Sequence, residues 1–389
     1  MTITFWSLCG IVAFTVAGYG SVMVALASLM PRRIRRRAQS RPLDVTVFIV
    51  ARNEERHIGA KIESVIAQDV VPHRLSVLVI SDGSTDRTVD IAASFDQHSV
   101  AVLEVPGGRG KIAALNVGLE WISGDVVVFS DANSELAPGA LAALLRHFAD
   151  PRVGGVCGAL QISAKRSGWL GAAENLYWRY DNALKKAESA LGGAVSAQGS
   201  LYAIRQEHVA PLPLSVADDF VMSTRVVAAG KILVFEPAAI AVELVSDSTQ
   251  GEFYRRVRST ERGWRGLLLM RGLLNPMRYN LYALQLLVHK VLRRVVPFLL
   301  LALFLLTGAM VQEHAAYAAL FVLQCAIYGI VFLAAIVPSV RRLPGLSFVF
   351  FFVAAQLAVA LGLLRVACGV HSRAWEPVRQ GNTATPKVS

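Results

Sequence analysis

A carboxylate and an amide lie two residues apart, directly after an unbroken apolar run. The run is Val126–Phe129, and Ser130, Asp131, Ala132 and Asn133 follow it. On an extended backbone, side chains two residues apart point to the same side. Hard cations such as Mg²⁺ and Mn²⁺ prefer oxygen ligands and are often held by one or two carboxylates together with substrate phosphates. The spacing therefore indicates a metal–phosphate site, with a strand followed by an ordinary Asp/Asn turn as the alternative.

The elements that must position these residues alternate between strands and helices. Apolar runs typical of buried strands lie at 45–51, 75–80, 100–105 and 126–130, and helical spacing of apolar residues lies at 54–68, 85–95 and 111–122. Such alternation predicts parallel strand pairing with right-handed crossovers, and therefore an α/β fold. Ser84 is expected to cap the second of these helices.

Polar residues follow three of the predicted strands. Asn53 and Glu54 follow the first strand, Asp82 follows the second, and Asp131 follows the fourth. Because the carboxyl ends of parallel strands meet at one edge of the sheet, where open α/β sheets bind ligands, we expect these side chains to lie together. Three such strand ends are harder to explain by turns than one.

A glycine-rich run invites comparison with phosphate-binding loops. A Walker A loop needs a glycine five residues before its Gly-Lys pair and a Ser or Thr after it. The run Gly107–Lys111 has Val105 and Ile112 at those places, so the motif fails. Lys111 remains a cation at a predicted helix start, within reach of a donor phosphate.

Both ends of the chain are apolar. The 389 residues are 54% hydrophobic with a mean hydropathy of +0.47, which is too apolar for a purely soluble protein. Residues 3–30 carry no charge, are long enough to span a bilayer, and are followed by the arginines of 32–41. Charge after the apolar run favours an uncleaved anchor over a signal peptide, and it places the next residues in the cytoplasm.

The C-terminal third contains three more candidate spans, at about 294–312, 315–338 and 346–369, and Tyr279–Arg294 suits an amphipathic helix in the interface. The predicted division is 1–41 (anchor and basic flank), 42–275 (cytoplasmic domain), 276–370 (interfacial helix and membrane bundle) and 371–389 (polar tail). Four crossings would put the C-terminus outside, whereas the basic residues 371–379 favour the cytoplasmic face. Either 280–293 enters the membrane or one span is misread.

The net charge of +11 does not indicate nucleic-acid binding, because much of the basic excess flanks membrane spans, where it sets topology and meets anionic lipid. The four cysteines are scattered, without metal or disulfide spacing, which suits a reducing cytoplasmic face.

With Asn53-Glu54, Ser81–Asp86, Gly110–Gly118 and Ser130–Asn133 in this order, the chain resembles family 2 glycosyltransferases, which are inverting enzymes with a GT-A fold, a mostly parallel sheet flanked by helices. Its membrane layout resembles that of bacterial chitin-oligosaccharide, poly-N-acetylglucosamine, hyaluronan and cellulose synthases. The resemblance implies a nucleotide-sugar donor, favouring a UDP-sugar, and a lipid-linked or growing glycan acceptor. It further implies Mg²⁺ or Mn²⁺, an inner-membrane location and possible export or assembly partner proteins.

The resemblance also implies roles for matching residues. Asp82 would contact the nucleoside, with Asn53 and Glu54 beside it. Asp131 and Asn133 would form the metal-binding triplet, where the family more often has Asp in the last place, so metal affinity is expected to be lower.

The pair Asp218-Asp219 matches the segment where the family carries Glu-Asp. Asp219 would be the catalytic base and Asp218 the second choice, since an inverting transfer needs one base for the acceptor hydroxyl. The structural alternative is a helix N-terminus, where acids favour the dipole, and both interpretations can hold together.

Gln198 and Gly199 resemble the loop that borders the acceptor. Chain-elongating synthases carry Gln-x-x-Arg-Trp nearby, whereas this chain has Arg258, Arg262 and Trp264, with Gly263 before the Trp and no Gln. The arginines could clamp phosphates and the tryptophan could stack on a sugar; an interfacial basic–aromatic helix is the alternative. The departure puts processive synthesis in doubt.

Two other function classes remain open. One is an inactive glycosyltransferase-like scaffold or a glycan-binding subunit of an export complex. The other is a transporter, which the scarcity of charges within the spans disfavours.

Overall fold

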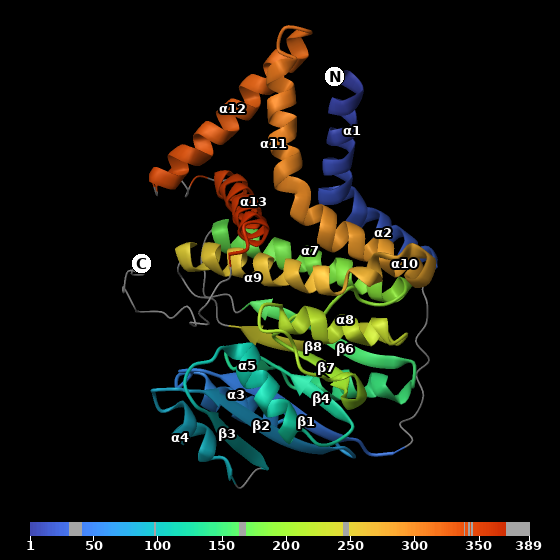
Figure 1. Ribbon diagram of the computed structural model, residues 1–389, viewed down its shortest axis with the longest axis vertical. Helices are drawn as coiled ribbons and strands as arrows, with labels where there is room; N and C mark the ends of the chain where they lie inside the picture. The colour runs from blue at the N-terminus through green and yellow to red at the C-terminus, as the bar shows by residue number, and fades with distance from the viewer. Residues whose placement is uncertain are drawn as a thin grey trace.

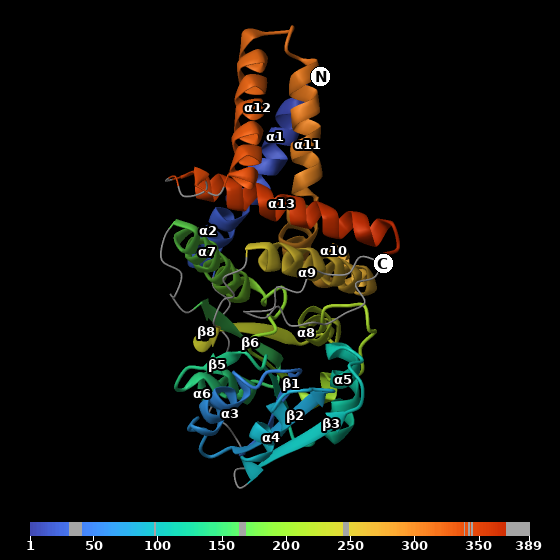
Figure 2. The ribbon, with the colours of Figure 1, turned by 90° about the vertical axis from the view of Figure 1, so that its left-hand side faces the viewer.

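The computed structural model describes residues 1–30, 41–96, 99–162, 169–243, 249–337, 339–340, 343 and 345–370. An eight-stranded sheet with the order β3-β2-β1-β4-β7-β6-β8-β5 occupies the lower half of the molecule in Figure 1, and long helices rise above it. Figure 2 shows helices on both faces of this sheet, with α3, α4 and α6 on one side and α5 and α8 on the other.

The first half of the domain is the predicted parallel α/β arrangement. Its strands are β1 (Asp44–Ala51), β2 (Arg74–Asp82), β3 (Val100–Val105) and β4 (Val126–Phe129), and its helices are α3 (Ile58–Ile66), α4 (Thr88–Ala93) and α5 (Lys111–Gly118). The expected cap at Ser84 is wrong, because α4 begins at Thr88. The Ser84 hydroxyl instead accepts a hydrogen bond from Asn53 N at 3.0 Å and joins two strand ends.

The second half makes the sheet mixed. Its elements are β5 (Ser134–Leu136), α6 (Ala140–Leu145), β6 (Val153–Ile162), α7 (Trp169–Leu191), β7 (Tyr202–Arg205), α8 (Asp218–Ala228), β8 (Ile232–Glu243) and α9 (Thr249–Leu269). Strand β7 runs antiparallel to both β4 and β6, β8 runs parallel to β6, and β5 runs antiparallel to β8. A mostly parallel sheet therefore describes only the first half of the domain.

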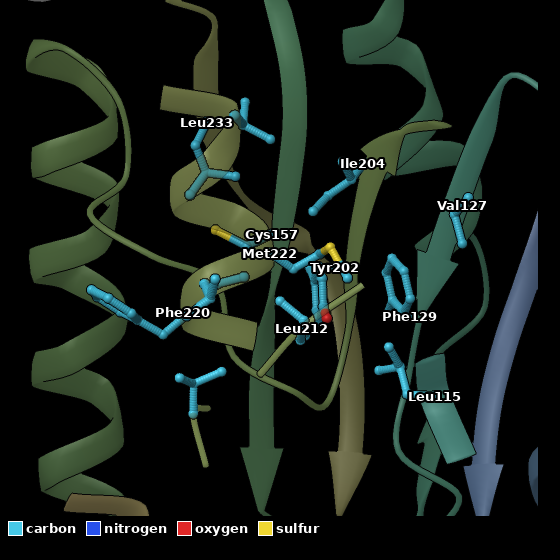
Figure 3. Packing of buried hydrophobic residues seen from close by; sticks show 14 of the residues in the cluster. Leu115, Val127, Phe129, Cys157, Tyr202, Ile204, Leu212, Phe220, Met222 and Leu233 are labelled. Carbon is cyan, nitrogen blue, oxygen red and sulfur yellow. The ribbon is translucent and has the colours of Figure 1, made fainter. Parts of the chain in front are cut away.

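The core lies on both faces of the sheet because successive strand residues point to opposite sides. On β1, Phe48 packs with α5 and α8, whereas Val47 and Ile49 pack with α3 and α6. Figure 3 shows the first of these clusters, in which Phe129 stacks on Tyr202 with ring centroids 5.0 Å apart. This packing supports the residues at the ends of the strands.

Four helical segments in the described part of the chain are long and apolar enough to cross a membrane, one N-terminal and three C-terminal, as predicted. They are Thr2–Leu29, which contains α1 (Thr2–Ala13) and α2 (Tyr19–Leu29); Pro276–Ala309, which contains α10 (Pro276–Leu286) and α11 (Arg293–Ala309); α12 (Ala315–Ile336); and α13 (Leu346–Ala367). In Figure 1, α10 lies across the top of the domain and α11 rises from it. The predicted topology signals at 32–37, 341–342 and 371–379 lie outside the described residues.

Candidate active site

A lysine joins two acidic segments that are far apart in the sequence. Lys111 begins α5, and its Nζ lies 2.8 Å from Asp131 Oδ1, just after β4, and 2.9 Å from Asp218 Oδ2, at the start of α8. Burial alone would lower the pKa of Lys111, but the charges of the two carboxylates raise it, so the lysine stays protonated at neutral pH. The fold therefore places one fixed cation between the predicted donor site and the predicted base.

A second lysine, which sequence reasoning missed, supports the turn that carries Asp131. Lys61 on α3 is fully buried, and its Nζ donates to Ser130 Oγ and to Ser134 O, each at 2.6 Å. Burial lowers the pKa of Lys61 to about 7, against the charges of Asp131 and Glu135. The apolar spacing of α3 gave no signal that a lysine would occupy its inner face.

The two aspartates at the start of α8 have opposite pKa shifts. Burial disfavours the ionised form of Asp218, but the ion pair with Lys111 outweighs it and lowers the pKa. At Asp219, burial and the charge of Asp218 raise the pKa to about 6, although Lys111 and a hydrogen bond from Phe220 N oppose the rise. Environments that separate two neighbouring carboxyls in this way often mark different chemical roles. The arrangement suits Asp219 as the group that exchanges a proton near neutral pH.

A buried hydroxyl next to these carboxyls was also missed. The side chain of Tyr202 on β7 is 1% exposed, and within the described ranges its hydroxyl has no hydrogen-bond partner. Burial, followed by the charges of Asp218, Asp219 and Asp131, raises the pKa of Tyr202 well above its ordinary value. Tyr202 is therefore a neutral hydrogen-bond donor close to the acidic residues.

The predicted nucleoside contact, Asp82, anchors the glycine-rich loop. It is fully buried at the end of β2, and its two carboxyl oxygens accept from Arg109 N and Gly110 N, each at 2.9 Å. Gly83 and Gly108 make this close packing possible, since a Cβ on Gly83 would lie 2.8 Å from Gly108 N. Asp82 thus shapes the loop that precedes Lys111, and a direct contact with a nucleoside stays a prediction.

Asn53 and Glu54 connect the ends of β1 and β2. Asn53 has a φ of 54° in the left-handed region, and its Oδ1 accepts from Thr85 N at 2.6 Å. Glu54 N donates to Thr88 Oγ1 at 2.7 Å, and the Glu54 carboxylate lies 2.9 Å from His57 Nδ1. These bonds delay the start of α3 to Ile58 and place both residues at the sheet edge where donor binding is expected.

Asp131 and Asn133 present oxygen atoms of the kind that Mg²⁺ and Mn²⁺ bind, and a further carboxylate lies beside them. Asn133 Nδ2 donates to Glu243 Oε1 at 3.0 Å, and burial raises the pKa of Glu243. In the part of the chain that the structure describes, no group of three or more His, Cys, Asp or Glu is arranged to hold a metal alone. The donor set fits an ion that takes its remaining ligands from a diphosphate.

The predicted acceptor loop packs directly against Asp131. A Cβ on Gly199 would lie 3.0 Å from Asp131 Oδ2, so a side chain at this position would push the Asp131 carboxylate away. The neighbouring Gln198 accepts a hydrogen bond from Lys185 Nζ at 2.5 Å, and Lys185 is paired with Asp181 at 2.9 Å. Helix α7 therefore holds the acceptor loop through a buried ion pair.

Helix α9 brings Arg262 to the acid pair, with Arg258 one turn before it. The Arg262 carbonyl accepts from Ala217 N at 3.2 Å, directly before Asp218. Burial lowers the pKa of the Arg262 guanidinium, although the charge of Asp218 opposes this shift. Burial and repulsion from Arg262 also lower the pKa of Arg258. Trp264, two residues after Arg262, packs against the core on this face of the sheet.

Packing explains why a glycine lies between Arg262 and Trp264. A Cβ on Gly263 would lie 2.6 Å from Arg294 Nη2, so the guanidinium of Arg294, at the start of α11, occupies that space. Arg294 Nη1 donates to Lys290 O at 2.9 Å, and Lys290 is one of the charges that oppose the raised pKa of Asp219. The apolar C-terminal region thus supplies two cations to this site, which sequence reasoning did not anticipate.

A buried polar group ties the site to the N-terminal helix as well. Tyr19 Oη on α2 donates to Glu188 Oε1 at 2.6 Å, and His289 Nδ1 lies 2.9 Å from the same oxygen. Glu188 lies on α7, one turn after Lys185. The apolar N-terminal and C-terminal helices therefore share one polar cluster with the helix that holds the predicted acceptor loop.

Residues 46–209 match the family model described as Glycosyl transferase family 2. The match includes the residues that surround Asp82, Lys111 and Asp131 and ends before the acid pair at the start of α8. The roles of Asp218 and Asp219 therefore depend on their geometry and on the resemblance stated above.

Two curated relatives extend this match. The chain is 24% identical over 250 residues to poly-beta-1,6-N-acetyl-D-glucosamine synthase of Staphylococcus aureus (strain COL), covering 62% of this chain and 60% of that protein. It is 26% identical over 286 residues to N-acetylglucosaminyltransferase of Rhizobium meliloti (strain 1021), covering 68% and 67%. The chain thus spans 60% of the length of the staphylococcal relative.

A solved structure matches almost the whole chain. The mannosyltransferase PcManGT from Pyrobaculum calidifontis, determined in complex with GDP-Man and Mn²⁺, has a TM-score of 0.70 at 21% identity and covers 93% of this chain and 98% of its own. This likeness establishes the GT-A fold.

Proposed function

Because this chain carries a glycosyl transferase family 2 domain, we propose that it transfers a sugar from a nucleotide-sugar to a lipid-linked or growing glycan, with inversion at the anomeric carbon. The observation that carries the proposal is the position of Lys111, which contacts Asp131 on the donor side and Asp218 on the side of the base. An inverting transfer needs these two acidic sites close together but chemically distinct.

Asp219 would act as the base. The acceptor oxygen attacks the anomeric carbon while its proton passes to the Asp219 carboxylate, and the bond from that carbon to the diphosphate oxygen breaks with its electron pair. A pKa of about 6 leaves Asp219 ionised at neutral pH yet basic enough to take the proton. Asp218 stays ionised beside Lys111 and holds that lysine in place.

Cations would stabilise the leaving nucleoside diphosphate. Lys111 and Arg262 lie next to the acid pair, and preorganised charges of this kind act where negative charge develops. A Mg²⁺ or Mn²⁺ ion held by Asp131 and Asn133 would supply a Lewis acid for the same diphosphate. Tyr202 would donate a hydrogen bond to a ligand oxygen at the centre of the site.

The names of the two relatives favour N-acetylglucosamine as the sugar, and hence a UDP-linked donor. The apolar helices and the arginines after the first of them favour a bacterial inner-membrane protein with its catalytic domain in the cytoplasm. Export or assembly proteins are proposed partners for the glycan product.

The test is a transfer assay with the full chain purified in detergent, labelled UDP-N-acetylglucosamine, Mn²⁺ and membrane lipid. Asp219→Asn is expected to lower the rate of transfer by about 10²–10⁴-fold, while Asp90→Asn, at an exposed position on α4, keeps full activity. Full activity of Asp219→Asn would make the assignment of the base wrong. If the unaltered chain neither transfers nor hydrolyses any nucleotide-sugar, the scaffold alternative replaces the enzyme.

A further inference from the structure

Helix α13 has the composition of a membrane span but the position of a helix that lies along the membrane surface. Within its 22 residues, an 18-residue window has a mean hydropathy of 2.3, well within the range of spanning helices. Figure 2 nevertheless shows α13 running across the molecule, between the upright helices α11 and α12 and the helix layer of the catalytic domain. The composition and the orientation therefore point to different topologies.

Contacts with α9 extend over most of the length of α13. Near its start, the Phe351 ring lies 4.7 Å from the Arg256 guanidinium. In its last third, Gly362 packs so tightly that a Cβ would lie 2.8 Å from Thr260 Cβ. Just beyond its end, Val370 O accepts from Arg265 Nη2 at 2.5 Å. At about 1.5 Å per residue, the helix between Phe351 and its last residue, Ala367, is roughly 24 Å long, and contacts with α9 occur along this length.

A buried ion pair reinforces this packing. Glu261 on α9 is fully buried, and it lies 2.6 Å from Arg265 Nη1 and 3.6 Å from Arg365 Nε on α13. Removing Arg365 from this position would leave Glu261 with less compensation for its burial. The contact is therefore part of the folded domain and not a loose approach of two helices.

Helix α9 cannot lie in the hydrocarbon region. Its sequence contains Glu252, Arg255, Arg256, Arg258, Glu261, Arg262 and Arg265, and charged side chains are costly at membrane depth. A spanning helix would carry one of its ends about 30 Å away from α9, on the far side of the bilayer. Since α13 touches α9 from Phe351 to Val370, both of its ends must lie at the level of α9.

The side of α13 that faces away from α9 exposes apolar side chains. Apolar side chains between 36% and 58% exposed form a stripe along it: Val349, Phe352, Leu357, Leu361 and Leu364. The upright helices α11 and α12 rise from the same level and expose further apolar residues, so the stripe continues their lipid-facing surface. Lipid acyl chains are the occupant that fits a surface of this composition and position.

We propose that α13 lies in the plane of the membrane, embedded in the leaflet that faces the catalytic domain, so that this chain crosses the bilayer three times. The first, N-terminal segment crosses toward the catalytic domain, α11 crosses away from it, and α12 returns. The residues after α12 then stay on the side of the catalytic domain. This arrangement removes the conflict between four crossings and the basic residues 371–379. It also goes beyond the proposed reaction, because it holds whether or not the enzyme is active.

The test compares the two ends of α13 by cysteine labelling in the full chain. All four native cysteines, Cys9, Cys157, Cys325 and Cys368, are first replaced by Ala. Three single-cysteine variants are then made in this background: Leu343→Cys before α13, the restored Cys368 after it, and Glu313→Cys in the connection between α11 and α12 as the control. A membrane-impermeant maleimide is applied to right-side-out and inverted vesicles. We expect Leu343→Cys and Cys368 to label only in inverted vesicles and Glu313→Cys only in right-side-out vesicles.

Labelling of the two α13 ends from opposite sides would overturn the proposal, as would labelling of all three positions from one side. Because replacing four cysteines could disturb folding, the same reagent is also used on the unaltered chain, with Cys368 identified by mass spectrometry. Modification of this native cysteine only in inverted vesicles supports the proposal, and modification in right-side-out vesicles contradicts it.

Discussion

At the scale of single residues, Lys111 decides how the acidic residues divide their roles. Its ammonium binds Asp131 and Asp218 but makes no hydrogen bond to Asp219. Asp218 is therefore held ionised, while burial and the charge of Asp218 raise the pKa of Asp219 next to it. One lysine thus separates a permanent anion from a group that can accept a proton.

The pKa of Asp219 predicts the acid limb of the activity profile. A base works only when ionised, so kcat should fall as the pH drops through about 6 and level off above it. Because the fold favours the protonated form, Asp219→Asn should be at least as stable as the unaltered chain at pH 7.5. The pH dependence of transfer and thermal unfolding at pH 7.5 check these points, and a profile unchanged down to pH 4 would contradict the first.

Replacing Lys111 should damage the site at both ends. In Lys111→Gln, Asp131 and Asp218 lose their shared cation, so we expect kcat/KM to fall by roughly 10²–10³-fold. The pKa of Asp218 should also rise, because the charge that lowers it is gone. Lys231→Gln is the matched control, since Lys231 Nζ donates an exposed hydrogen bond to Pro151 O and contacts none of the proposed site residues within the described part of the chain. Equal activity of the two variants would show that Lys111 is merely structural.

At the scale of elements, α9 joins the proposed catalytic site to the apolar C-terminal helices. It places Arg262 beside the acid pair, lies next to Arg294 of α11 at Gly263, and packs along α13. The departure from Gln-x-x-Arg-Trp is therefore a close contact between helices. A side chain at this position would force the guanidinium of Arg294 to move.

Gly263→Ala should displace Arg294 and weaken acceptor use. Since the added Cβ would lie 2.6 Å from Arg294 Nη2, we expect kcat/KM for the acceptor to fall roughly ten- to a hundredfold while donor binding is kept. Gly272→Ala is the control, because a Cβ on Gly272 meets nothing within 4 Å. Steady-state kinetics with each substrate varied in turn measure both effects, and a uniform loss in both variants would argue against a specific role.

At the scale of the whole molecule, the site is assembled from parts that lie far apart along the chain and share one sheet and core. The parallel first half supplies Asp82, Lys111 and Asp131, the mixed second half supplies Tyr202 and the acid pair, and the C-terminal helices supply Lys290 and Arg294. The cluster of Tyr19, Glu188 and His289 fixes these helices to α7.

Because the predicted metal ligands are few, we predict that the affinity for the metal depends on whether the nucleotide donor is bound. Asp131 and Asn133 offer one carboxylate and one amide, and Lys111 already contacts Asp131, so Mn²⁺ should bind weakly to the free protein and much more tightly with UDP present. Calorimetry with Mn²⁺ alone, then with UDP, measures the difference. Asp131→Asn should abolish the gain from UDP, and tight binding of Mn²⁺ to the free protein would contradict the prediction.

The sequence by itself determined the local features of this protein. Apolar runs and helical spacing placed β1 to β4 and α3 to α5 within a few residues, because burial of one face imposes those periods on the chain. The polar residues at the strand ends and the long apolar segments could also be recognised from the sequence, because each follows from the local order of apolar and polar residues. The start of α4 was predicted too early, because Ser84 accepts a hydrogen bond from Asn53, which follows β1, and does not cap the helix.

Only the tertiary structure decided which residues meet. Lys61, Tyr202 and Lys290 carry no signal in their local sequence, since their importance comes from neighbours on other elements. The antiparallel insertion of β7 between β4 and β6 brings Tyr202 to Phe129, and the close contact at Gly263 brings Arg294 to α9. The orientation of α13 is of the same kind: hydropathy measures how apolar a helix is, whereas its direction is set by the charged helix that it packs against.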